Sequence, residues 1–109
     1  MRINLNRRMD SIFGFEKWLV TSSIRDMVVE QIDISYVEET ITFLGKDVED
    51  MFIAVFVGRN SKVTALGING DISDWGEHDL GIRDAEDLDV PPFFGYEFVL
   101  GVLRGRGII

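Results

Sequence analysis

Residues 71–89 concentrate the side chains that could do chemistry: eight carboxylates, the chain's one histidine and a tryptophan. His78 is flanked by Glu77 and Asp79, and Ser73 precedes them, so a hydroxyl, an imidazole and a carboxylate are present for nucleophilic catalysis. No nucleophile-elbow sequence surrounds Ser73, and a shared stretch does not align the three groups. We therefore predict no catalytic residues. An alternative is a small enzyme or ligand-binding domain with His78 and nearby carboxylates at a pocket.

The same stretch is as rich in acids as a calcium-binding loop. Counting from Asp71, a glycine stands at the sixth position, as in an EF-hand. The ligand pattern fails at two other positions, because the fifth is Trp75 and the twelfth is Ile82, where an oxygen ligand and a bidentate glutamate are needed. We expect no metal site and no cofactor.

Composition removes several further classes of site. The chain has no cysteine, which excludes disulfides, thiolate nucleophiles and cysteine-based metal sites. Gly67 and Gly70 are not followed by the lysine of a phosphate loop. No apolar run approaches the roughly 20 residues that span a bilayer, and the first residues lack the apolar segment of a signal peptide. A cytoplasmic protein without membrane association is expected.

The net charge of −8 is unevenly distributed along the chain. Residues 26–50 contain eight acids and one base, residues 71–89 again contain eight acids and one base, and the remainder carries +6. Direct binding to nucleic acid is disfavoured, because that affinity comes from lysine and arginine contacts to phosphates. A basic protein partner is expected instead, since complementary potentials steer association.

We interpret the chain as a non-enzymatic inhibitor that occludes a basic site on another protein, such as a nuclease or a nucleic-acid-binding protein. Small acidic toxin-immunity and phage anti-defence proteins have this general character, although no motif here carries the comparison. A third interpretation is a structural subunit of a homo-oligomer whose acidity serves solubility. The residues predicted to contact the partner are Asp71, Asp74, Trp75, Glu77, His78, Asp79, Asp84, Glu86, Asp87 and Asp89.

The length of 109 residues predicts one domain, 1–109. Ile3 and Leu5 alternate with polar residues, which indicates a short strand. A helix capped by Asp10 or Ser11 should follow. Its apolar face would comprise Ile12, Phe15, Trp18 and Leu19.

The alternation of apolar residues within 32–43 indicates strand structure and slips by one position near Glu38, where we expect either a bulge or a tight turn. Residues 51–57 are apolar throughout, which is typical of an interior strand covered on both faces. We expect Phe52 and Phe56 to lie in the core.

The next strand, residues 62–68, should form a hairpin with 51–57 through a turn at 58–61. Residues 71–92 lack regular apolar spacing, so we expect a long loop with one helical turn near 84–88.

The segment Phe93–Leu103 fits either a strand or a helix, and its aromatic content and two internal glycines favour a strand. Trp75 is either a core anchor or an interface anchor, and the core position is the commoner one. The predicted fold class is α+β: a mainly antiparallel sheet of four to six strands with one or two helices packed on one face.

Overall fold

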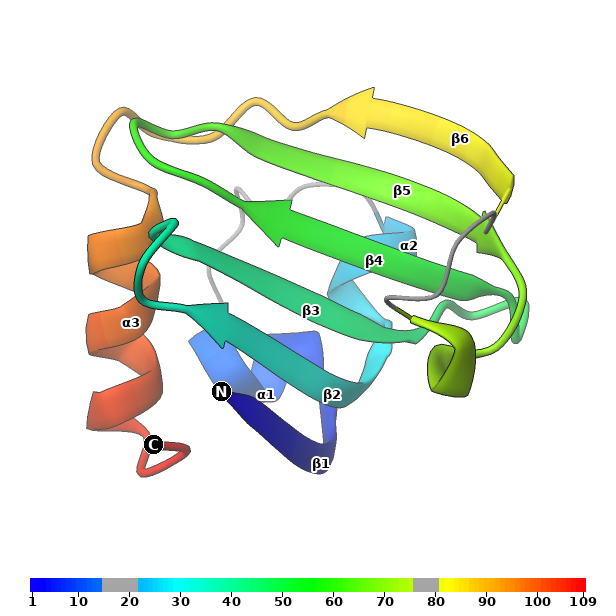
Figure 1. The fold of residues 1–109 in the computed structure, drawn as a ribbon, viewed down its shortest axis with the longest axis horizontal. Coiled ribbons are helices and arrows are strands. Elements are labelled where there is room, and N and C mark those ends of the chain that lie inside the picture. Colours follow the sequence, from blue (N-terminus) through cyan, green and yellow to red (C-terminus); the bar gives the residue numbers. More distant parts are fainter. Residues whose placement is uncertain (15–21, 76–80) are drawn as a thin grey trace.

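The computed structural model describes residues 1–14, 22–75 and 81–109. In these parts of the chain an antiparallel sheet of six strands combines with helices, which confirms the α+β class (Figure 1). In Figure 1, α1 and α2 lie behind the sheet and α3 stands at one end of it. The elements in order are β1 (Arg2–Arg8), α1 (Met9–Phe13), α2 (Ser22–Arg25), β2 (Val28–Ser35), β3 (Thr40–Lys46), β4 (Phe52–Val57), β5 (Val63–Asn69), the 3₁₀ helix η1 (Ile72–Asp74), β6 (Gly81–Asp87) and α3 (Tyr96–Gly105).

The sheet is a simple meander, because the spatial order of its strands is the order in the sequence. Each strand pairs antiparallel with the next, and β1 and β6 form the two edges. The apolar alternation predicted a change near Glu38, and the chain does turn there between β2 and β3, with Glu39 in the left-handed region at φ 56°. The strand predicted around Ile3 and Leu5 is β1.

The hairpin between β4 and β5 is confirmed, with pairs running from Ile53 opposite Gly67 to Val57 opposite Val63. Its turn places Asn60 and Ser61 in the left-handed region, at φ 54° and 61°. Left-handed backbone at both central positions gives the twist that a tight hairpin needs. Asparagine adopts this conformation readily, whereas serine does so at a cost.

The main core lies between the inner face of the sheet and the helices. Phe43 at the centre of β3 is 0% exposed, and its ring lies 5.7 Å from the ring of Phe13 in α1, in an edge-to-face arrangement. Phe13 also lies 5.8 Å from Phe94 in the segment before α3. This aromatic chain joins the sheet to both ends of the sequence.

A smaller apolar cluster covers part of the outer face of the sheet. Leu44, Ala54 and Ile68 are buried there, and η1 packs over them. Phe56 on the same face is 36% exposed, so the prediction that it belongs to the core is wrong. Phe52 is half-buried. Strand β4 is therefore covered on both faces only in its middle.

The prediction of a strand at 93–103 is also wrong, since Tyr96–Gly105 is the helix α3. Tyr96, Val99, Leu100 and Leu103 are buried on one side of it, which is the spacing of an amphipathic helix. Gly101 and Gly105 are exposed, and no atom lies within 4 Å of where their side chains would be. They lower helix propensity without opening a gap in the core.

The expected long loop at 71–92 is corrected as well, because β6 pairs with β5 across Thr64–Asn69. The alternation that marks a half-buried strand is missing, because six of the seven residues of β6 are exposed and only Arg83 is partly covered. An edge strand with both faces in water can consist of acids. The helical turn expected near 84–88 is absent from these described residues.

The first predicted helix is only partly described. Helix α1 begins at Met9, after Arg8, and no side chain caps it, so the prediction of a cap at Asp10 or Ser11 is wrong. Ser11 instead donates a hydrogen bond to the Arg8 carbonyl at 2.7 Å. Ile12 is buried as expected. The other members of the predicted face, Phe15, Trp18 and Leu19, lie outside the described residues.

Candidate functional site

Of the ten residues predicted to contact a partner, the seven that the structure describes do not form one surface. Glu77, His78 and Asp79 lie outside the described residues. Asp71 and Asp74 hold η1 together: the Asp71 side chain accepts from the Ser73 backbone N–H, and the Asp74 carboxylate accepts from the Asp71 N–H, both at 3.2 Å. These two carboxylates form a reciprocal cap on the turn.

Trp75, at the end of η1, is half-buried and packs against the outer cluster of Leu44, Ala54 and Ile68. This contact favours the core-anchor interpretation, in which the indole fixes η1 to the sheet.

The remaining acids lie on β6 and just beyond it, divided between the two faces of the sheet. Asp87 is on the outer face, where it accepts a hydrogen bond from Thr64 Oγ1 at 2.9 Å. Asp84 and Glu86 alternate with it and lie opposite Gly67 and Ala65 on the helix side. Asp89 follows the strand and is exposed.

Asp84 and Glu86 line a cleft of about 420 Å³ on the helix side of the β6 edge. A third carboxylate, Asp47, joins them from the turn between β3 and β4. Asp47 Oδ1 accepts the backbone N–H groups of Glu49 and Met51 at 2.9 and 3.0 Å, which fixes the direction of this side chain. The apolar lining includes Ile24, Ile53 and Ala65.

Among the described residues that line this cleft, Arg83 is the one base. Its Nη2 donates to the Phe52 carbonyl at 3.0 Å, and its Nη1 lies 3.6 Å from Asp84 Oδ2. Its buried Nε has no hydrogen-bond partner among the residues that the structure describes. The guanidinium lies against the backbone of Gly67. A Cβ added at Gly67 would lie only 3.0 Å from both Arg83 Nη2 and Asp84 Oδ2. The described lining residues, three carboxylates and one guanidinium, carry a net charge of −2.

Asp47, Gly67 and the orientation of Arg83 were not indicated by the sequence. Asp47 is one of several acids in residues 26–50, and only the pairing of β3 with β4 and β5 with β6 brings it to β6. The run of acids in residues 81–89 was the feature of the sequence that pointed to this site. The chain-wide charge count did not separate acids on the inner face from those on the outer face.

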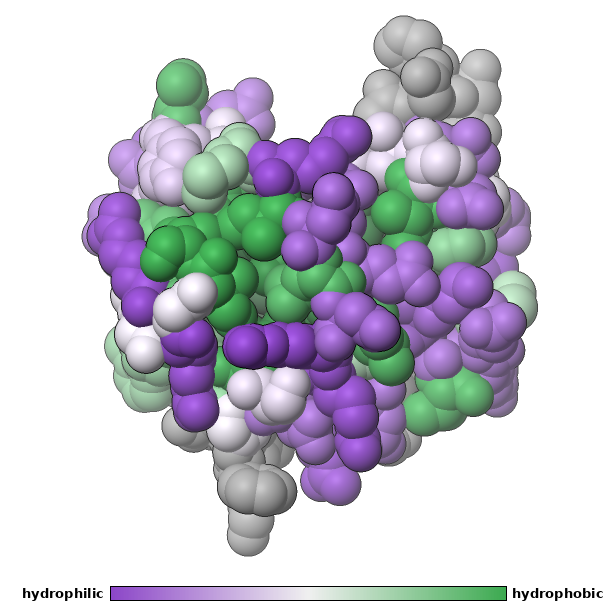
Figure 2. Space-filling view, turned by 90° about the horizontal axis from the view of Figure 1, so that it is seen from below, coloured by the Kyte–Doolittle hydropathy of each residue, from purple (hydrophilic) through white to green (hydrophobic). Residues whose placement is uncertain are grey.

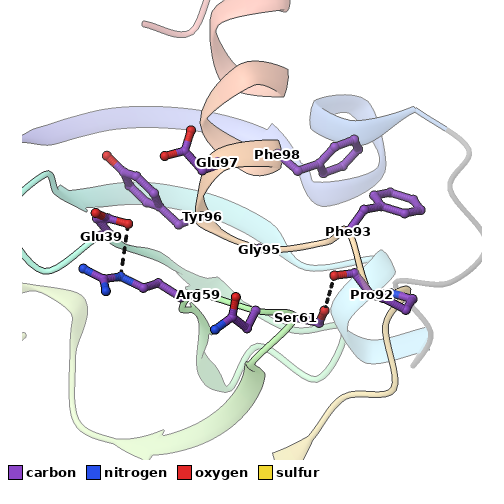
Figure 3. A pocket seen from close by; sticks show the side chains of 10 residues that line it. Glu39, Arg59, Ser61, Pro92, Phe93, Gly95, Tyr96, Glu97 and Phe98 are labelled. Carbon is purple, nitrogen blue, oxygen red and sulfur yellow. Dashed lines mark hydrogen bonds and ion pairs between the residues drawn. The ribbon is translucent and has the colours of Figure 1, made fainter.

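A second cavity of about 230 Å³ lies where α3 begins, between the β2–β3 and β4–β5 turns (Figure 3). Glu39 and Arg59 form an ion pair at its margin, with 3.0 Å between Oε2 and Nε. Ser61 Oγ donates to the Pro92 carbonyl at 2.6 Å. The Tyr96 backbone N–H donates to the Gly58 carbonyl at 3.0 Å. These bonds attach the start of α3 to the hairpin turn.

The polar groups of this second cavity are not arranged as a nucleophile and base. The Ser61 hydroxyl is directed at a backbone carbonyl, as Figure 3 shows, rather than at a basic side chain. Burial raises the pKa of Tyr96, and the nearby Glu97 carboxylate adds to the rise. Tyr96 therefore stays protonated at neutral pH. His78, on which the enzyme alternative depends, is not among the described residues.

Ser61 offers a test of the attachment of α3. Replacing Ser61 with alanine removes the bond to Pro92 but keeps the left-handed backbone, so we expect a loss of about 1 kcal/mol in the free energy of unfolding. Replacing it with glycine removes the same bond but relieves the backbone conformation, so this variant should be closer to the parent. Urea denaturation measures both. A glycine variant less stable than the alanine variant would contradict this explanation.

Across the described ranges, no group of three or more carboxylates or histidines is placed to hold a metal ion, and no helix is long and apolar enough to cross a membrane. Comparisons with protein-family models, with curated protein sequences and with solved structures found no match.

Proposed function

We propose that this domain is a non-enzymatic binding protein that holds a basic protein at the β6 edge, with a lysine or arginine of the partner in the acidic cleft. The observation that carries the proposal is the convergence of Asp47 with Asp84 and Glu86 around one cleft beside an exposed edge strand. A residue from the β3–β4 turn and two residues from the edge strand β6 thus build one anionic site.

The lining of the cleft matches the chemistry of a long basic side chain. Lysine and arginine combine an aliphatic stem with a cationic head, and the cleft combines Ile24, Ile53 and Ala65 with the carboxylates. Ile82 lies on the other face of β6, opposite Ile68 of the outer cluster, and is 61% exposed, so a partner that reaches around the edge also finds an apolar contact there. An exposed edge strand also offers unpaired backbone groups to an extended segment.

The acidity also supports a class of partner. A nuclease or another nucleic-acid-binding protein presents the basic surface that such a cleft would cover, and the same negative charge repels the nucleic acid itself. We therefore propose an inhibitor of the kind represented by toxin-immunity or anti-defence proteins, acting in the cytoplasm.

Affinity capture with matched variants tests this proposal. The immobilised domain should retain a basic protein from an extract of the native host. The double variant that combines Asp84→Gln with Glu86→Gln should lose it. The control replaces Glu38 and Glu97, which are exposed and lie away from the cleft, with glutamine. Both variants change the net charge by the same amount, so only a site at β6 separates them.

The retained protein is then identified by mass spectrometry, purified and measured against all three forms of the domain. Retention that is equal for the two double variants would show that β6 is not the binding site. A partner without excess basic charge would contradict the proposed chemistry.

A further inference from the structure

The other edge of the sheet, β1, is built differently from β6. Figure 2 shows apolar side chains grouped on the underside of the molecule, the side on which Figure 1 places β1 and the end of α3. Ile3 and Leu5 are half-buried and pack against the core from β1, and Ile108 does so from beyond α3. A groove of about 280 Å³ runs between Ile108 and residues 3–7.

The hydrogen bonds between β1 and β2 show which backbone groups of β1 are directed outward. Met1 and Ile34 exchange two bonds, at 2.6 and 2.8 Å. In an antiparallel ladder, hydrogen-bonded and non-hydrogen-bonded residue pairs alternate. The backbone N–H and C=O groups of Ile3 are therefore directed at β2, and those of Arg2 and Asn4 are directed away from the sheet. The register shift comes only after Asn4.

We infer that β1 is a self-association edge, at which two copies of the chain pair antiparallel about a twofold axis at Ile3. In this register Arg2 of each copy exchanges backbone hydrogen bonds with Asn4 of the other, which uses the outward groups of both residues. Ile3 lies opposite Ile3 of the second copy, and Leu5 lies opposite Met1. All three apolar residues are on the helix side, since Met1 and Ile3 pair with the buried Ile34 and Ile32.

The charges favour a second copy over an acidic peptide. Arg2 is paired with Asp33 at 3.2 Å, and Arg8 with Asp26 at 2.7 Å, so these arginines offer little to a new carboxylate. Two Arg7 side chains would be eight positions apart in this register, roughly 26 Å along a strand, well beyond the screening length of about 8 Å at physiological salt.

The position of the acids supports the same edge. Asp84, Glu86 and Asp87 are all on β6, the opposite edge of the sheet. Pairing through β1 keeps the two acidic edges far apart and limits repulsion between two chains of net charge −8. The acidic cleft of each copy also stays open, so this inference is independent of the proposed function.

Sedimentation velocity over a range of protein concentrations tests the pairing. We expect a monomer–dimer equilibrium with little dependence on salt. The variant Asn4→Pro removes an outward N–H and adds a ring at the edge, which β1 of the monomer tolerates. Two hydrogen bonds are lost per dimer, so its dissociation constant should rise by at least about tenfold.

The matched control is Ala85→Pro on β6. Leu88 N–H donates to the Val63 carbonyl at 2.8 Å. Because residues of β6 alternate between bonding to β5 and facing outward, the backbone N–H of Ala85, three positions earlier, is directed away from the sheet. This variant should dimerise like the parent. Circular dichroism confirms that both proline variants fold. The inference would be overturned if Ala85→Pro lost the dimer or if larger species formed. It would also be overturned if the parent stayed a monomer at every concentration, and the groove would then be left for a different extended segment.

Single cysteines test the register, since the chain has none of its own. Under mild oxidation, two Ile3→Cys chains should form a disulfide. The two residues would be directly opposite each other in a non-hydrogen-bonded pair, which brings their thiols within reach of a disulfide. Asn4→Cys, which would lie opposite Arg2, should link far less. Equal linking by both variants, or preferential linking by Asn4→Cys, would overturn the proposed axis.

Discussion

Replacing Phe43 with alanine is expected to lower the free energy of unfolding by about 3–5 kcal/mol, through lost burial and the cavity that remains. Phe43 is fully buried in a central strand, and its ring contacts Phe13. Small domains are stable by only about 5–15 kcal/mol, so this single change removes a large part of the total. Urea denaturation with an unchanged m-value measures the loss.

Phe56→Ala on the neighbouring strand β4 is the matched control. Phe56 is 36% exposed on the outer face, so its removal leaves no closed cavity, and a loss of about 1 kcal/mol is expected. Equal losses for the two phenylalanines would contradict the assignment of the inner face as the core.

Reversing charge in the cleft should have the largest effect on binding. With Asp84 and Glu86 both replaced by lysine, association with the basic partner should slow by about tenfold, and affinity should fall by about a hundredfold or more. The partner's cation would meet two like charges where it now meets two carboxylates. For the parent domain, rising salt should slow association, because charges farther apart than about 8–10 Å become screened.

The control reverses Glu38 and Glu97 in the same way. Association rates and dissociation rates are measured by surface plasmon resonance at two salt concentrations. If the two reversals slow association equally, net charge and not the cleft steers the partner. If neither has an effect, the binding surface lies elsewhere.

The sequence predicted elements well wherever burial on one face imposed a pattern. Alternation located β1 and the turn near Glu38, and the apolar run with its polar turn located the β4–β5 hairpin. The pattern was lost in β6, because both of its faces are in water. It was ambiguous in α3, where aromatic residues and glycines oppose helix formation and tertiary packing against α1 and β3 decides the outcome.

The candidate site was only partly predictable for a related reason. Acidic side chains on β6 were identified from their density, but density does not show that Asp84 faces the helices while Asp87 faces Thr64. Asp47 is more than thirty positions away from β6 along the chain. Its place in the cleft follows from strand register, which a single sequence does not specify.

The meander order also bears on how the chain reaches this structure. The connections at 36–39, 47–51 and 58–62 are short, and closing a short loop costs little chain entropy. Strands β2 to β5 can therefore zip together hairpin by hairpin, with each new strand meeting a neighbour just made. Helix α3 has no such local route, since it must find β3 and α1 across most of the sequence. Until α3 docks, the part of the inner face that it covers stays exposed, so we expect a folding chain to be most prone to aggregation before this step.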